Sequence, residues 1–181
     1  LYDNRLLMNK LIKKYQNYFF PVLVIIALSF ARIIPHPSNF TPILAVGIFS
    51  GFYFKNFIFS FFIVIFSMFL GDVYLGFHST MFFTYTSLSL AVLIGFFIKK
   101  LNFKEVVFGG LASSACFFII TNFGVWILSP MYEKSFAGLM HSYIMGIPFF
   151  HNTLISTLLY LLLFKLLFLN FKKKNIVESS V

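Results

Sequence analysis

The residues of this apolar chain that we take as candidates for chemistry lie in four short segments. The first, residues 31–42, carries Arg32, His36 and Asn39 among three prolines that stiffen the backbone. The forked guanidinium of an arginine suits a carboxylate or a phosphate. An arginine at a helix end also commonly extends to lipid headgroups. This segment is therefore predicted to be either part of a binding site or a rigid turn between helices.

The second segment, residues 71–78, contains Asp72 within an otherwise apolar stretch. Ionisable groups at membrane depth are costly and usually face a cavity or one another. We expect Asp72 to pair with Arg32 or with a histidine, in a structural ion pair or in a ligand site. Tyr74 and His78 are four residues apart, so they share a face if the helix continues.

The third segment places Phe118, Asn122 and Trp126 on one helix face, at a spacing of four residues. Asn122 is a candidate for lining a pocket, but it could also bridge two helices by a hydrogen bond. Trp126 is a second candidate, although tryptophan is common at membrane interfaces.

The fourth segment surrounds Pro148, which we expect to separate two helices and to expose backbone groups to a cavity. His141 precedes the proline, while His151 and Asn152 follow it. With His36, His78 and Asp72, these histidines are chemically suited to a metal ion. No local ligand spacing supports such a site, so the metal question stays open.

No known catalytic motif occurs: the sequence lacks the serine nucleophile elbow, the zinc-protease helix motif, the phosphate-binding loop and the dinucleotide-binding glycine motif. We therefore expect neither an enzyme nor a cofactor. A histidine-based membrane enzyme or proton-coupled carrier remains an alternative. It requires His36 and His78 to lie within hydrogen-bond reach of each other or of Asp72.

The elements that position these residues are predicted to be membrane helices. Sixty per cent of the 181 residues are hydrophobic and 10% are charged, against about 25% charged in a soluble domain. A membrane-spanning helix needs about 20 apolar residues. We predict an all-α polytopic membrane protein, with a short interfacial or re-entrant helix (Ser135–Gly146) and six spans: Tyr18–Ile34, Pro42–Phe54, Phe57–Phe77, Met81–Ile98, Val106–Leu128 and Phe149–Leu169.

The net charge of +9 gives the orientation of these spans. Basic residues favour the cytoplasmic side, and both termini are therefore placed in the cytoplasm, in a bacterial inner membrane. The predicted organisation is a basic N-terminal segment (1–17), a transmembrane domain (18–169) and a basic tail (170–181). The basic excess is thus an orientation signal, and no nucleic-acid binding is expected. The predicted cytoplasmic side holds eleven basic residues: Arg5, Lys10, Lys13, Lys14, Lys55, Lys99, Lys100, Lys104, Lys172, Lys173 and Lys174.

In this topology all four histidines and most other polar candidates fall on the outer side, which predicts a polar pocket open to the outside. Two pairs of small residues, Gly47 with Gly51 and Ala27 with Ala31, are spaced for close helix packing, within the chain or against a partner.

Four sequence runs resemble an uncharacterised bacterial family of six-helix integral membrane proteins. They are RIIPHPSNFTPILAVGIFSG, LGDVYLGFHSTMFFTY, TNFGVWILSPMY and GIPFFHNTL, within residues 31–164. The architecture is also similar to the substrate-binding S components of energy-coupling factor vitamin transporters. That resemblance implies an outer ligand site closed by residues 35–42 and 130–148, and docking of Ala27 and Ala31 on a coupling subunit that works with ATPases.

The leading hypothesis is a substrate-binding subunit of an importer for a small, vitamin-like solute. Its partners would be the lipid bilayer, the solute, a coupling subunit and ATPases. The main alternative is a membrane assembly or scaffolding protein in which the polar residues only hold helices together. The candidate solute-binding residues are Arg32, His36, Asn39, Asp72, Tyr74, His78, Asn122, Trp126, His141 and Asn152.

Overall fold

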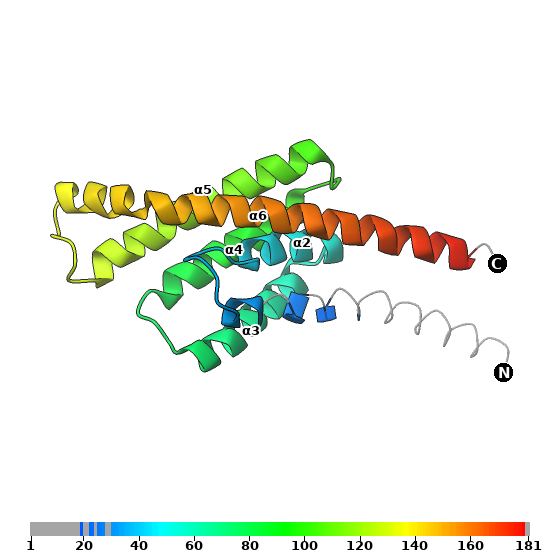
Figure 1. Cartoon of the computed structure of the whole chain (residues 1–181), viewed down its shortest axis with the longest axis horizontal. Coiled ribbons are helices and arrows are strands. Elements are labelled where there is room, and N and C mark those ends of the chain that lie inside the picture. The colour runs from blue at the N-terminus through cyan, green and yellow to red at the C-terminus, as the bar shows by residue number, and fades with distance from the viewer. Residues whose placement is uncertain (1–18, 20–21, 24, 28–29, 180–181) are drawn as a thin grey trace.

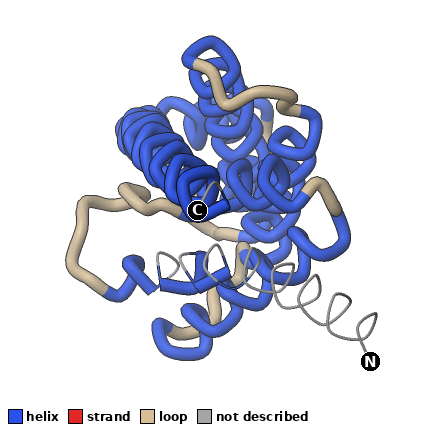
Figure 2. The backbone as a smooth tube through the Cα atoms, turned by 90° about the vertical axis from the view of Figure 1, so that its right-hand side faces the viewer, coloured by secondary structure: helices blue, strands red, loops and turns tan. Residues whose placement is uncertain are grey.

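The computed structural model describes residues 19, 22–23, 25–27 and 30–179, with side chains up to residue 170. Every regular element in that part is helical, as predicted (Figures 1 and 2). The basic segment 1–17 and part of the first predicted span lie outside the described residues. The elements are the short 3-10 helix η1 (Phe30–Ile33) and the α-helices α2 (Ile43–Phe54), α3 (Phe57–Leu75), α4 (Met81–Phe97), α5 (Phe103–Leu128) and α6 (Phe136–Ser179).

Three of these helices are long and apolar enough to cross a bilayer. They are α3, α5 and the Phe136–Asn170 part of α6, with mean hydropathies of 2.1, 1.8 and 1.9. The other two, α2 and α4, are apolar but shorter, with 12 and 17 residues. These helices indicate a membrane protein. The number of spans and the orientation stay predictions.

The two faces of α3 differ in the way that is typical of a helix in a lipid environment. The face toward the bundle buries small or polar residues such as Ser60, Ser67 and Gly71. Small residues of this kind let membrane helices approach one another closely. The opposite face is exposed and strongly apolar, which would be unfavourable in water but is suited to lipid. It carries Ile58, Phe62, Phe66, Phe69 and Val73.

At the centre of the bundle, α2 is buried on almost all sides. Ten of its 12 residues are buried, and it packs against α3, α4, α5 and α6. The closest approach is to α4: a Cβ on Gly51 would lie 2.1 Å from the Val92 carbonyl oxygen, and one on Gly95 would lie 1.9 Å from that of Ile48. The pair Gly47 and Gly51 therefore serves packing within the chain.

The prediction of a separate helix over Ser135–Gly146, followed by a span from Phe149, is wrong. The chain forms one helix, α6, with Pro148 inside it. Proline removes one backbone hydrogen bond, but ending a helix among apolar residues would expose several unsatisfied groups. The predicted tail 170–181 also continues α6 as far as Ser179. At about 1.5 Å per residue, α6 is roughly 66 Å long.

One end of the bundle is basic. There Lys55, between α2 and α3, donates from Nζ to the carbonyl oxygens of Phe96 (2.9 Å) and Ile98 at the end of α4. Partial burial lowers the pKa of Lys55 from its ordinary value, and nearby Glu105 offsets part of that effect. Glu105 in turn accepts the backbone N–H groups of Lys99 and Lys100. These contacts fix the loops at this end.

The close contact of α2 and α4 makes a prediction. Gly51→Ala should destabilise the protein by about 1–3 kcal/mol, because an overpacked side chain forces the two backbones apart. The expected result is a lower melting temperature in detergent, measured by fluorescence-detected size exclusion after heating. Ala137→Leu, on an exposed position of α6, is the control and should melt like the parent chain. Equal melting of Gly51→Ala and the parent would contradict the importance of this contact.

Candidate functional site

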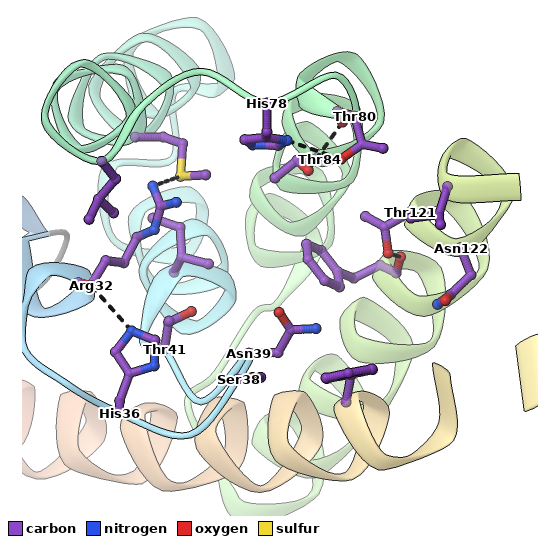
Figure 3. Close-up of a pocket in the computed structure, with 16 residues that line it drawn as sticks. Arg32, His36, Ser38, Asn39, Thr41, His78, Thr80, Thr84, Thr121 and Asn122 are labelled. Atoms are coloured by element: carbon purple, nitrogen blue, oxygen red, sulfur yellow. Dashed lines mark hydrogen bonds between the residues drawn. The ribbon is translucent and has the colours of Figure 1, made fainter. Parts of the chain in front are cut away.

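A polar cavity of about 480 Å³ lies at the N-terminal end of α2 (Figure 3). Lys55 follows the opposite end of that helix. Ten of its 16 lining residues are polar, and its size falls in the range typical of small-ligand pockets. The polar ones are Arg32, His36, Ser38, Asn39, Thr41, His78, Thr80, Thr84, Thr121 and Asn122, and the others are Ile43, Met68, Leu75, Phe117, Val125 and Phe149.

One wall of the cavity is the loop between η1 and α2. Its prolines restrict the backbone, and the Phe40 N–H donates to the Pro37 carbonyl (2.9 Å) in a tight turn. Asn39 adopts a positive φ of 61° at that turn, a conformation that asparagine tolerates better than most residues. The Asn152 side chain of α6 donates to the Ser38 carbonyl (3.0 Å) and ties the loop to the last helix.

Behind this wall, Arg32 belongs to a network that joins three elements. Its Nη1 donates to Oδ1 of Asp72 on α3 (2.9 Å), and the Tyr85 hydroxyl of α4 donates to Oδ2 (2.8 Å). Asp72 is fully buried, whereas the Arg32 side chain keeps 15% exposure. The predicted pairing of Asp72 with Arg32 is confirmed. Gly71 leaves room for it, since a Cβ there would lie 3.2 Å from Nη1.

Both cavity histidines bond to neighbours close in sequence. The two ring nitrogens of His36 face the carbonyl oxygens of Pro37 (2.8 Å) and Arg32 (3.2 Å). His78 Nδ1 bonds to the Thr80 hydroxyl (3.0 Å). No hydrogen bond joins these histidines to each other or to Asp72, and the described residues contain no cluster of three or more metal-ligating side chains.

The far wall is formed by α5, where Asn122 lines the cavity beside Thr121. The Asn122 amide donates to the Phe118 carbonyl (2.8 Å) on its own helix. Its side chain packs against Gly146 of α6, where a Cβ would lie 2.4 Å from the amide oxygen. Asn122 therefore borders the cavity and also fits the contact between α5 and α6.

The structure does not bring the other predicted residues to the cavity. Tyr74 is 71% exposed on α3. Trp126 donates from its indole to the Glu133 carbonyl (2.9 Å) and His141 packs on the Tyr132 ring, so both belong to the end of α5 and the start of α6. Asn152 acts on the cavity only through its bond to Ser38. The predicted docking pair lies apart from the cavity: Ala27 is exposed and Ala31 is half-buried in η1.

Sequence reasoning missed the hydroxyl side chains of the cavity. Thr41 precedes Pro42 and α2, and no side chain caps that helix. Thr80 and Thr84, at the beginning of α4, and Thr121, on α5, each bring a hydroxyl to the cavity. A signal existed in the sequence: Thr80 and Thr84 are four residues apart, so they share one helix face with each other.

A family model matches residues 13–177, which is most of the chain. The chain belongs to the family of unknown function DUF6580. The predicted membership of an uncharacterised family is thereby confirmed. The DUF6580 match includes the whole cavity, from Arg32 to Phe149. No curated protein and no solved structure matches the chain.

The Arg32–Asp72 pair makes a stability prediction. Arg32→Gln should cost roughly 3 kcal/mol, because it leaves a buried carboxylate without its counter-charge. In the double variant Arg32→Gln with Asp72→Asn, no charge is left unpaired, and much of the lost stability should return. Melting temperatures of both variants in detergent measure this. A double variant less stable than Arg32→Gln alone would contradict the pairing argument.

Proposed function

We propose that the chain is a substrate-binding membrane subunit that takes up a small polar solute in the cavity between Arg32 and Asn122. The observation that carries the proposal is the cavity itself. It gathers ten polar side chains at one end of a bundle whose exposed surface is mostly apolar. A concave site with a few convergent polar groups is the usual form of a small-molecule site.

The polar groups are suited to recognition because some of them keep donors that their bonds within the fold leave over. Of the Arg32 guanidinium, only Nη1 is engaged within the described part of the chain, leaving Nε and Nη2 with three N–H donors. Thr41 and Asn39 add a hydroxyl and an amide on the loop wall. A solute that hydrogen-bonds to such groups replaces the water that would otherwise solvate them.

We further propose that the solute is vitamin-like and that uptake depends on a coupling subunit with ATPases. Two points support this. The chain lacks a nucleotide-binding motif of its own, and the cavity lies opposite the lysine-bearing end, as in an S component of an energy-coupling factor transporter. Exposed Ala27 and half-buried Ala31 would contact the coupling subunit.

The scaffold alternative is favoured by one observation, the Arg32–Asp72–Tyr85 network, which would hold three elements together without any ligand. The two candidate functions predict different effects for conservative substitutions of these residues. In a scaffold, Asp72→Asn lowers the yield of folded protein and cavity substitutions have no other effect. In a binding subunit, cavity substitutions leave folded protein that no longer responds to its solute. Size-exclusion profiles of the variants separate these outcomes.

Solute binding is tested by a thermal-shift screen of the purified chain against vitamins and other small polar solutes. We expect at least one compound to raise the melting temperature by several degrees, since a ligand at 100 times its Kd contributes about 2.7 kcal/mol. His78→Ala and Asn122→Ala should abolish the shift. His141→Ala is the matched control, because it removes a histidine outside the cavity, and it should keep the shift. A screen without any stabilising compound would overturn the proposal.

The cavity is also proposed to open to the outside, because the basic end should be cytoplasmic. In a Cys116→Ser background, Ser79→Cys at the cavity end should react with a membrane-impermeant maleimide on intact spheroplasts. Lys100→Cys, at the basic end, should react only after permeabilisation. Both positions are exposed, so the two labelling patterns are comparable. The reverse pattern would place the cavity on the cytoplasmic side.

A further inference from the structure

We infer that the solute is an oxyanion, a small molecule with a carboxylate or phosphate group that binds to Arg32. The inference rests on the proposed function and adds the charge of the ligand. Its basis is the distribution of charge around the cavity. Among the described side chains, one permanent cation and two histidines line the cavity, and no carboxylate does.

The three acidic residues whose side chains the structure describes are all directed elsewhere. Both Asp72 oxygens are occupied, one by Arg32 and one by Tyr85, and the residue is fully buried. Glu105 binds backbone N–H groups at the opposite end, and exposed Glu133 accepts from the Ser135 hydroxyl (3.1 Å) beyond α5. A cationic solute would therefore meet Arg32 without any carboxylate to bind it.

Arg32 is held in a geometry that suits an oxyanion. Asp72 fixes one nitrogen of the guanidinium, and Gly71 lets the group lie against the α3 backbone. No group in the described part of the chain bonds to the edge formed by Nε and Nη2. That edge suits a bidentate contact, the geometry that arginine makes with carboxylates and phosphates. A positioned side chain loses less conformational entropy on binding than a free one.

One further feature favours negative charge at this place. The helix α2 begins at the cavity, where Thr41 and Ile43 line it, and no side chain caps that end. The N-terminus of a helix carries a partial positive charge.

The test uses matched pairs of probes on the full chain in detergent, with affinities measured by isothermal titration. The pairs are nicotinate with nicotinamide, pantothenate with panthenol, and riboflavin phosphate with riboflavin. Thiamine and choline serve as cationic probes. We expect the anionic member of at least one pair to bind at least tenfold more tightly than its uncharged partner. A preference for nicotinate or pantothenate over the uncharged partner would indicate a carboxylate ligand, and a preference for riboflavin phosphate over riboflavin would indicate a phosphate.

The variants assign the preference to Arg32. Arg32→Lys keeps the charge but loses the fork, and the preference should fall severalfold. The double variant Arg32→Gln with Asp72→Asn, which leaves no unpaired buried charge, should bind both members of a pair alike. Glu133→Gln, away from the cavity, is the control and should keep the full preference.

The outcomes separate this inference from the proposed function. If uncharged or cationic probes bind as well as anionic ones, and His78→Ala removes that binding, the oxyanion inference fails and the solute-binding function stands. An anion preference that survives in the double variant also overturns the assignment to Arg32. If no probe and no compound of the wider screen binds, both fail together.

Discussion

The close packing of α2 against α4 is the constraint on which the rest of the structure depends. A Cβ on Gly51 of α2 would overlap the backbone of α4, and a Cβ on Gly95 of α4 would overlap the backbone of α2. This contact draws a 12-residue helix into the centre of the bundle, and the other helices then surround it. A helix of that length covers only about 18 Å. The cavity lies beyond its N-terminal end, where Thr41 and Ile43 line it.

The helices bury one class of side chain and expose another. Small and hydroxyl residues fill the contacts between helices, while phenylalanine and other large apolar residues are directed outward, as on α3. In water, large apolar side chains directed outward would remain exposed to solvent and would not stabilise the fold. Between lipid chains, helices associate mainly through close packing. The polar groups of the cavity are tolerated because they lie at one end of the bundle and bond to nearby carbonyl groups.

Much of the fold could be predicted because apolar runs with polar or proline boundaries determine where membrane helices begin and end. The predicted spans Phe57–Phe77, Met81–Ile98 and Val106–Leu128 agree with α3, α4 and α5 to within three residues. Pro148 misled the prediction, since its effect depends on the apolar surroundings and not on the proline alone. The site was partly predictable: charged Arg32 and Asp72 must find each other in an apolar chain. The hydroxyls of Thr80, Thr84 and Thr121 are too common in sequence to stand out before the fold brings them together.

The bond between Asn152 and the Ser38 carbonyl has a consequence for biogenesis. Its partners are 114 residues apart, and at a synthesis rate of roughly 5–20 residues per second the ribosome needs about 6–23 s to pass from one to the other. During that interval the loop with Ser38 lacks its anchor on α6. This wall of the cavity is thus tied to the last helix late in translation, and a nascent chain truncated before α6 has the loop without this hydrogen bond.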